Sequence, residues 1–284
     1  MTFTWNDIAA KLDGNDFGPS LAAQLPIVII TWQGTGVDMW TGPPADTARA
    51  AVGAFPQLFA WQPVGNYPAA TYPMGPSVAA GVAEGIRLAT QVWPNNLLLP
   101  IGYSQGGICA SHWWRDWCLT NGQQSRVVGA VTFGNPCRSP GYANGNAFAG
   151  WPMPGLKDGV VTGGISGPDC LTPSQTPATW LDFVEMGTDN GATELYTNCP
   201  VGSNPWTAEA QPGIVGTSIY NVVQNATVLD LAKVAADLFI PIGTVEEIIN
   251  GLTFAGAGPA ADHYNYSIDG AVEYLTGVVA KRFA

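Results

Sequence analysis

Short, nearly continuous apolar runs divide the first half of the chain and end in turn-forming residues. The first is PIVIITW at Pro26–Trp32, followed by the turn QGTG at 33–36. Comparable runs occupy 58–64, 97–103 and 127–133. Apolar runs of this length, rich in β-branched residues and without strict alternation, are typical of strands buried on both faces of a parallel sheet. We therefore predict four such strands.

Segments with helical spacing alternate with these runs. Residues 77–93 place Val78, Val82 and Ile86 close to one helical face before Pro94, and further helices are expected at 46–54 and 105–119. The alternation of strands and helices predicts an α/β fold built from strand–helix–strand crossovers. Proline cannot donate to a sheet ladder, so Pro100 predicts a local irregularity in the strand at 97–103.

The second half of the chain is less regular. Residues 138–178 are rich in glycine and proline and predict a long ordered insertion of the kind that forms lids, followed by a late strand at 179–186. Residues 207–250 have helical patterning. We expect one α/β domain over 1–284, with the segments 138–178 and 207–256 as candidate lid or linker subdomains.

Charge excludes several classes of partner. Charged residues make up 11% of the chain, the formal net charge is −11, and the ten lysines and arginines form no basic run. Nucleic acid is therefore not expected as a partner, because phosphates would be repelled. The sequence contains no apolar stretch of eighteen residues, the length that would predict a membrane helix. The first sixteen residues lack the basic start of a secretory signal, so we expect synthesis in the cytoplasm without one.

The five cysteines show no metal-ligand spacing such as C-x-x-C. We expect neither a metal nor another cofactor. Cys170 with Cys199 is the only pair we consider for a disulfide.

The candidate catalytic motif is GYSQG at Gly102–Gly106, which matches the nucleophile elbow G-x-S-x-G. The motif follows a predicted strand and opens a predicted helix, as the elbow requires. Small residues on both sides let the serine adopt a strained turn with its Oγ projecting outward. Ser104 is the expected nucleophile.

A serine hydroxyl needs a base, and the chain has two histidines. His112 lies on the helix after Ser104, about 12 Å along its axis at 1.5 Å per residue, which excludes it as the base. Its neighbours Trp113, Trp114 and Trp117 favour a packing role. His263 lies in a late loop, in the order Ser, acid, His of α/β hydrolases, and is the expected base.

The acid that orients the histidine should follow the late strand. Asp189 and Glu194 both qualify, and Asp189 is favoured because it lies closer to the end of that strand. Asp182 falls inside the strand, where pairing or solvation is the expected role. Asp262 adjoins His263 too closely to bond its ring.

Two backbone N–H groups should stabilise the oxyanion. Gln105, the residue after the nucleophile, supplies one. Gly34 or Thr35, in the turn after the first strand, is expected to supply the other, although this turn could also serve only to reverse the chain.

These motifs together resemble those of the mycobacteriophage lysin B family of cutinase-like esterases. The resemblance rests on WQGTG, GYSQGG, FGNP, LYTN and DHYNY, in that order along the chain. It implies an α/β-hydrolase fold with a mostly parallel sheet flanked by helices and an inserted lid or linker subdomain. Family members commonly have Gly-Asp before Leu-Tyr, whereas this chain has Thr193-Glu194, which keeps both acids open.

The resemblance further implies a serine esterase that cleaves mycolic acids from arabinogalactan at the host envelope during phage lysis. Two alternatives remain at this stage. One is a general cutinase- or lipase-type carboxylesterase, which differs in substrate only. The other is a catalytically silent α/β domain that binds wall or lipid.

Overall fold

Five parallel strands form the central sheet of the protein. The computed structural model describes residues 27–70, 73–155, 159–188, 194–201, 206, 214–225 and 262–283. The strands lie in the order β2-β1-β3-β4-β6. Their bounds are β1 (Ile27–Trp32), β2 (Phe59–Pro63), β3 (Leu97–Tyr103), β4 (Ala130–Phe133) and β6 (Trp180–Phe183). The predicted strands, including the late one, are confirmed.

Pro100 lies within β3, where the ladder to the next strand is interrupted. Leu98 pairs with Val127 in an isolated bridge, and regular pairing resumes only at Ile101 with Val131. From Leu98 to Ile101 the chain advances three residues, whereas from Val127 to Val131 the neighbouring segment advances four. The neighbouring segment thus holds one extra residue, as in a β-bulge. The proline ring falls in this break and the expected irregularity is confirmed.

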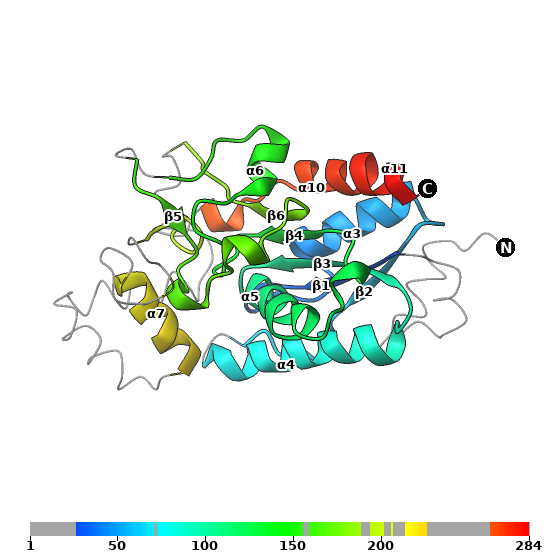
Figure 1. The fold of residues 1–284 in the computed structure, drawn as a ribbon, viewed down its shortest axis with the longest axis horizontal. Coiled ribbons are helices and arrows are strands. Elements are labelled where there is room, and N and C mark those ends of the chain that lie inside the picture. Colours follow the sequence, from blue (N-terminus) through cyan, green and yellow to red (C-terminus); the bar gives the residue numbers. More distant parts are fainter. Residues whose placement is uncertain are drawn as a thin grey trace.

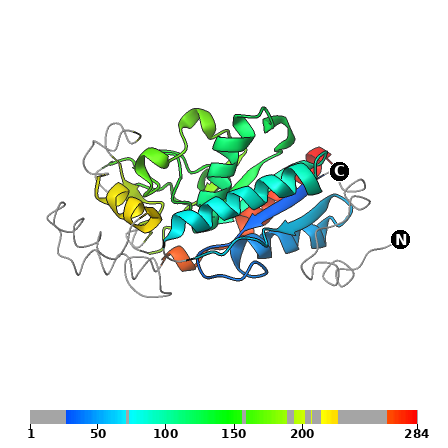
Figure 2. The same ribbon diagram turned by 90° about the horizontal axis from the view of Figure 1, so that it is seen from below.

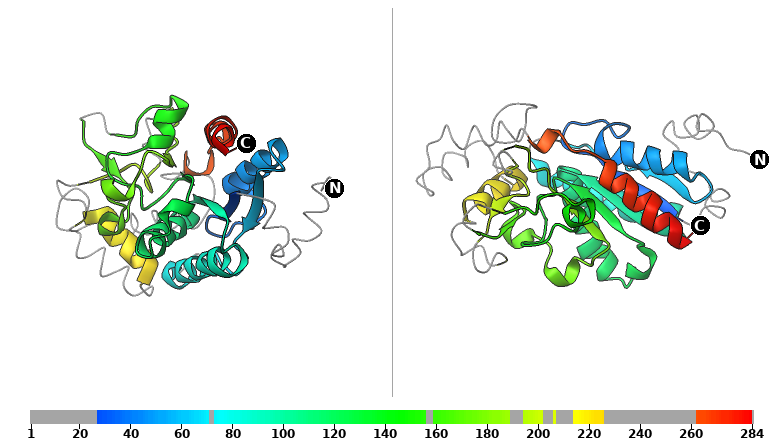
Figure 3. Two further views of the ribbon diagram at one scale, coloured as in Figure 1. Left: turned by 45° about the vertical axis from the view of Figure 1, so that its right-hand side comes forward. Right: turned by 90° about the horizontal axis from the view of Figure 1, so that it is seen from above.

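Helices cover both faces of the sheet (Figures 1 and 2). One face carries α3 (Gly42–Ala54) and the C-terminal run α10 (Asp269–Glu273), η8 (Tyr274–Val279) and α11 (Ala280–Phe283). The other carries α4 (Met74–Arg87), η1 (Leu88–Val92), α5 (Gln105–His112) and η2 (Trp113–Leu119). The left view of Figure 3 shows α4 on one side of the strands, and α3 and the C-terminal helices on the other.

The side chains of β1 show how the sheet serves both layers. Val28, Ile30 and Trp32 belong to the apolar cluster that includes Val78 of α4 and Ile108 of α5. Ile27 and Ile29 belong to the opposite cluster, with α3 and the C-terminal helices. Successive side chains of a strand point to opposite faces, so a strand covered on both sides must be apolar throughout.

The second half of the chain holds shorter elements. Between β4 and β6 lie α6 (Asn144–Ala149), β5 (Thr162–Gly163), η4 (Gly167–Asp169) and η5 (Pro173–Gln175), and η3 (Gln124–Arg126) precedes β4. Strand β5 pairs antiparallel with β7 (Cys199–Pro200). Beyond these come α7 (Ile214–Asn225) and η7 (Asp262–Tyr264). Most of the predicted linker at 207–256 lies outside the described residues, so its role stays a prediction.

All five cysteines are free. The Sγ atom of Cys170 instead lies 3.2 Å from Ser166 Oγ and 3.3 Å from the carbonyl oxygen of Gly164. Pairing of Cys170 with Cys199, which we considered from the sequence, is therefore wrong for this structure. Within the described part of the chain, no helix combines the length and the apolar character needed to span a membrane.

Candidate active site

Ser104 occupies a sharp turn between β3 and α5. Its backbone has φ 55° and ψ −120°, and Ala69 is the one other non-glycine residue with positive φ among those described. The Ser104 N–H donates to the carbonyl oxygen of Phe133 at 2.9 Å, which fixes the turn to the end of β4. A strained backbone held by its neighbours is the geometry of a nucleophile elbow.

The glycines of GYSQGG are required by close backbone contacts. A Cβ on Gly102 would collide with the carbonyl oxygen of Gly106, and a Cβ on Gly106 would collide with that of Trp32. A Cβ on Gly107 would come within 3.1 Å of the Asn135 side chain. The motif therefore reflects the packing of β3, α5 and β1 around the serine.

His263 lies in η7 with its side chain 2% exposed. Its Nδ1 is 3.0 and 3.1 Å from the two carboxylate oxygens of Glu194, which is completely buried. The hydroxyl of Tyr103 donates to the His263 carbonyl at 2.9 Å, and the Tyr196 ring lies 4.2 Å from the imidazole between centroids. Backbone and ring are thus both restrained.

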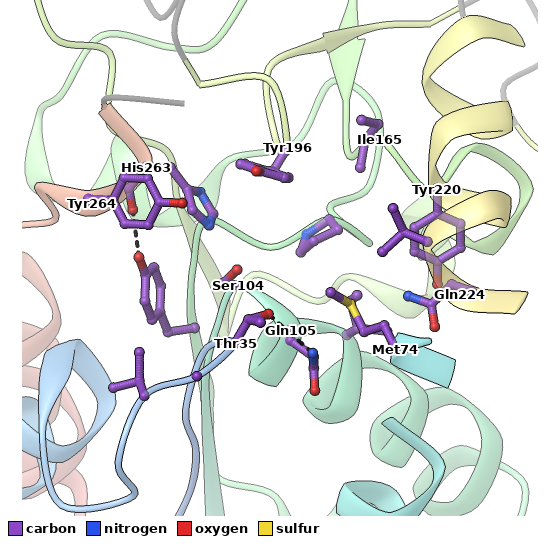
Figure 4. Close-up of a pocket in the computed structure, with 16 residues that line it drawn as sticks. Thr35, Met74, Ser104, Gln105, Ile165, Tyr196, Tyr220, Gln224, His263 and Tyr264 are labelled. Carbon is purple, nitrogen blue, oxygen red and sulfur yellow. Dashed lines mark hydrogen bonds between the residues drawn. The ribbon is translucent and has the colours of Figure 1, made fainter. Parts of the chain in front are cut away.

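The other ring nitrogen of His263, Nε2, is buried and has no hydrogen-bond partner within the described residues. Ser104 and His263 line the same cavity, and Figure 4 shows their side chains directed into a common space. A carboxylate on Nδ1 favours the tautomer that leaves Nε2 able to accept a proton. The arrangement suits a base serving Ser104.

Among the residues that the structure describes, Glu194 supplies the carboxylate hydrogen-bonded to the histidine ring. The sequence favoured Asp189 with Glu194 as the alternative, whereas Asp189 lies outside the described residues. Glu194 also accepts a hydrogen bond from the Tyr266 hydroxyl at 2.8 Å. Tyr266 was not expected from the sequence, although its place in DHYNY, three residues after the histidine, gave a signal that could have found it.

Asp182 has a separate, structural role inside β6. It is buried and accepts hydrogen bonds from Thr132 and from the Asn135 side chain, the latter at 2.9 Å. Burial raises the pKa of this carboxyl group. Its pairing with neighbouring polar groups is as predicted.

The loop after β1 lies directly beside the nucleophile. A Cβ on Gly34 would come 2.8 Å from the ring of Tyr103 and 3.3 Å from Ser104 Cβ. Thr35 lines the cavity together with Ser104 and Gln105. The residues expected to supply the oxyanion donors are therefore brought together at one sheet edge.

The cavity beside Ser104 has a volume of about 390 Å³ and mostly apolar walls (Figure 4). Its apolar lining comes from five parts of the fold: Val37, Met74, Ile108, Ile165 and Val223. Tyr220 and Gln224 of α7 complete one side. Such a cavity suits a hydrocarbon chain better than a sugar or a phosphate.

His112 belongs to a different polar cluster, on the far side of Tyr220. Its Nε2 lies 2.8 Å from Asp169 Oδ2, and the Tyr220 hydroxyl donates to the same oxygen at 2.7 Å. Arg115 lies 2.9 Å from the other carboxylate oxygen. Burial would lower the pKa of His112, but the hydrogen bond and charge of Asp169 outweigh it and raise the pKa to about 10. Such a histidine stays protonated and cannot act as a base near neutral pH.

The fold also groups residues that the sequence kept apart. Ligand atoms of His112, Cys137 and Asp169 lie within 4.8 Å of one another, the one group among the described residues that could hold a metal ion. Sequence spacing gave no sign of it. However, Asp169 is already bonded to His112, Arg115 and Tyr220, and an arginine at this distance disfavours a bound cation.

Comparison with known proteins finds similarity to phage lysins. No family model matches the sequence. Over 130 residues it is 38% identical to Endolysin B of Mycobacterium phage D29, covering 42% of this chain and 50% of the relative. Over 126 residues it is 37% identical to Endolysin B of Mycobacterium phage L5, covering 41% and 48%. The chain thus spans about half the length of the curated relatives it matches.

The crystal structure of lysin B from Mycobacteriophage D29 matches over 88% of this chain and 99% of that chain, with a TM-score of 0.64 and 25% identity. The resemblance to the lysin B family is confirmed. The architecture is that of an α/β hydrolase, with the elbow at the carboxyl end of a central parallel strand. In this protein the cavity, Ser104 and the Glu194–His263 pair all lie at that edge of the sheet.

Proposed function

We propose that the protein is a serine esterase that hydrolyses the ester bond between mycolic acids and arabinogalactan. The observation that carries this proposal is a buried Glu194–His263 pair whose free Nε2 shares an apolar cavity with a serine on a strained elbow. Burying a carboxylate against an imidazole costs free energy, and such buried pairs of titratable groups are frequent at functional sites. Activation of a serine is the use that this geometry suits.

In the proposed reaction Ser104 Oγ attacks the ester carbonyl carbon while His263 Nε2 accepts the hydroxyl proton. Glu194 stabilises the imidazolium and keeps Nδ1 as a donor. The same proton then passes to the oxygen of the departing alcohol, leaving an acyl group on Ser104. His263 next takes a proton from water while the water oxygen attacks the acyl carbon. The bond from this carbon to Ser104 Oγ then breaks, His263 returns the proton to Oγ, and the acid is released.

The negative charge that develops on the carbonyl oxygen is assigned to the backbone N–H groups of Gln105 and of Thr35 or Gly34. These residues flank Ser104 at the end of the cavity. Preformed donors at this position would stabilise the tetrahedral state more than the flat ester, and this difference is what accelerates the reaction.

The substrate assignment rests on the apolar cavity and the likeness to proteins named Endolysin B. A hydrocarbon-lined cavity beside the nucleophile would take the acyl side of the ester, and the alcohol side would remain toward solvent. Action at the host envelope during lysis follows from such a substrate. A general cutinase- or lipase-type esterase would share the same residues and differ only in substrate range.

The test incubates purified protein with mycolyl-arabinogalactan and measures free mycolic acids by mass spectrometry. We expect release by the wild type and none by Ser104→Ala, with an unchanged melting temperature because the elbow hydroxyl contributes little packing. A fluorophosphonate probe should label the wild type at Ser104 only. Hydrolysis of p-nitrophenyl esters without mycolate release would favour the general esterase. Undiminished activity in Ser104→Ala would overturn the mechanism.

A further inference from the structure

The side chain of Gln105 is buried, with 1% of its surface exposed, and uses all four of its hydrogen-bonding positions. Its Nε2 donates to Thr35 Oγ1 at 3.1 Å and to the carbonyl oxygen of Ala70 at 2.8 Å. Its Oε1 accepts from the hydroxyls of Tyr67 and Ser77, both at 2.8 Å. Gln105 thus acts in two ways. Its backbone N–H belongs to the elbow, and its side chain bonds four other groups.

The partners leave only one orientation for this amide group. The carbonyl oxygen of Ala70 can only accept, so the NH2 group must face it. Ser77 Oγ already accepts from the Ala70 N–H at 2.9 Å, so its own hydrogen is available for Oε1. Burial raises the pKa of Tyr67 well above its ordinary value, which keeps its hydroxyl a donor. Because Oε1 takes both hydroxyls, Nε2 must point at Thr35.

The bond from Nε2 to Thr35 connects the two sides of the proposed oxyanion hole (Figure 4). Thr35 belongs to the loop after β1, which is expected to supply one backbone donor. Gln105 supplies the other through its own N–H. The same loop is tied a second time, where Gly36 N–H donates at 2.9 Å to the carbonyl oxygen of Ala69, a residue with φ 48°. The loop is therefore fixed relative to Ser104 before any substrate arrives.

We propose that the Gln105 side chain is a positioning residue that preforms the oxyanion hole by holding Thr35, with Tyr67 and Ser77 setting the orientation of its amide. This inference rests on the proposed esterase function. Donors that are already in place cost no reorganisation when charge develops, whereas a loop free to shift by about 1 Å loses on the order of 10²-fold in rate.

The test replaces Gln105 with methionine, which keeps the length of the side chain and adds no charge. We expect kcat for p-nitrophenyl butyrate to fall roughly 10- to 100-fold, with KM within about twofold, because the loss concerns the transition state. Affinity for phenylboronic acid, which forms a tetrahedral adduct on an activated serine, should fall in parallel. Binding of dodecanol, which only fills the apolar cavity, should not change.

A milder variant, Tyr67→Phe, keeps the ring and removes one hydroxyl that orients the amide, and should shift kcat and boronate affinity in the same direction by a smaller factor. Adding Thr35→Val to Gln105→Met should cost less than the two separate effects combined, because both remove one bond. Ser111→Ala, a buried change elsewhere on α5, is the matched control and should leave kcat and boronate affinity unaltered.

The outcomes separate this inference from the proposed function. Wild-type turnover that does not depend on Ser104 would refute the esterase itself. Ser104-dependent turnover with unchanged kcat and boronate affinity in both Gln105→Met and Tyr67→Phe would refute only the positioning role. Loss of kcat in Gln105→Met with wild-type boronate affinity would also contradict it, since the oxyanion hole would then be intact.

Discussion

The two histidines differ in what holds their rings. The Nδ1 of His263 is bonded by Glu194 and its Nε2 faces the cavity, whereas the Nε2 of His112 is bonded to Asp169 beside Arg115. A base needs a ring nitrogen that is free to accept the proton of the serine hydroxyl. The Nε2 of His263, which faces the cavity that Ser104 also lines, meets this requirement.

We therefore expect His263→Ala to lower kcat for p-nitrophenyl esters by roughly 10⁴-fold or more, because Ser104 loses the group that accepts its proton. His112→Ala should keep kcat and KM near wild type and lower the melting temperature. Steady-state kinetics and thermal denaturation, measured on the same preparations of both variants, decide which histidine is the base. Inactive His112→Ala with active His263→Ala would reverse the assignment.

The acid can be tested by two changes that keep shape and remove charge. Glu194→Gln should lower kcat on the order of 10⁴-fold, because the imidazolium loses its counter-charge and the tautomer is no longer fixed. Asp189→Asn serves as the matched comparison and should retain turnover. If Asp189→Asn shows the large loss while Glu194→Gln does not, the contact between Glu194 and His263 has no catalytic role.

At the scale of elements, a series of polar contacts joins α7 to the layer that contains α5. The Tyr220 hydroxyl bonds Asp169 of η4, which in turn bonds His112 of α5 and Arg115 of η2. Tyr220 and Gln224 also line the cavity. One carboxylate thus joins a wall of the proposed acyl site to the central layer, and the lid expected from the sequence stays a prediction.

This attachment predicts a pH dependence of stability. The pKa of His112 is raised to about 10 in the folded protein, against about 6.5 for an unperturbed histidine. Its contribution is therefore fully present below about pH 6.5 and is lost as the pH rises toward 10. The melting-temperature gap between wild type and His112→Gln should be largest near pH 6 and shrink by pH 10. A constant gap would contradict the raised pKa.

At the scale of the whole molecule, the sheet collects the candidate site at one edge. The loop containing Gly34 and Thr35 follows β1, Ser104 follows β3, and Glu194 comes after β6. Ligand sites in parallel sheets form at the carboxyl ends of the strands, because loops from several strands converge there. Every protein group in the proposed reaction is thus supplied by the chain itself.

Activity should therefore survive removal of metal ions. The proposed steps use Ser104, His263 and Glu194, and an activated serine needs no Lewis acid. Dialysis against EDTA should leave the rate of p-nitrophenyl ester hydrolysis unchanged. Inactivation by EDTA that zinc reverses would contradict the serine mechanism and direct attention to His112, Cys137 and Asp169.

Much of the fold was predictable because its signals are local. An apolar run between turns specifies a buried strand, and small residues around a serine specify an elbow, without reference to distant residues. The irregularity in β3 was likewise predictable, because Pro100 cannot donate to a sheet ladder. The chain has only two histidines, and His112 lies about 12 Å from Ser104 along the same helix, out of reach, so elimination also identified His263 as the expected base.

Contacts between polar groups that are distant in the sequence depended instead on the path of the loops between elements. Glu194 and His263 are separated by 69 positions, and only the folded path after β6 brings Glu194 to the imidazole. The partners of the Gln105 side chain come from three segments that no motif connects. The sequence likewise offered no means to decide whether Cys170 and Cys199 pair, or to tell that His112 and Cys137 lie together. Sequence periodicity determined the strands, the helices and the elbow, because these follow from short-range sterics and burial. The tertiary structure alone decided which distant polar groups meet, because such contacts depend on the closure of long loops.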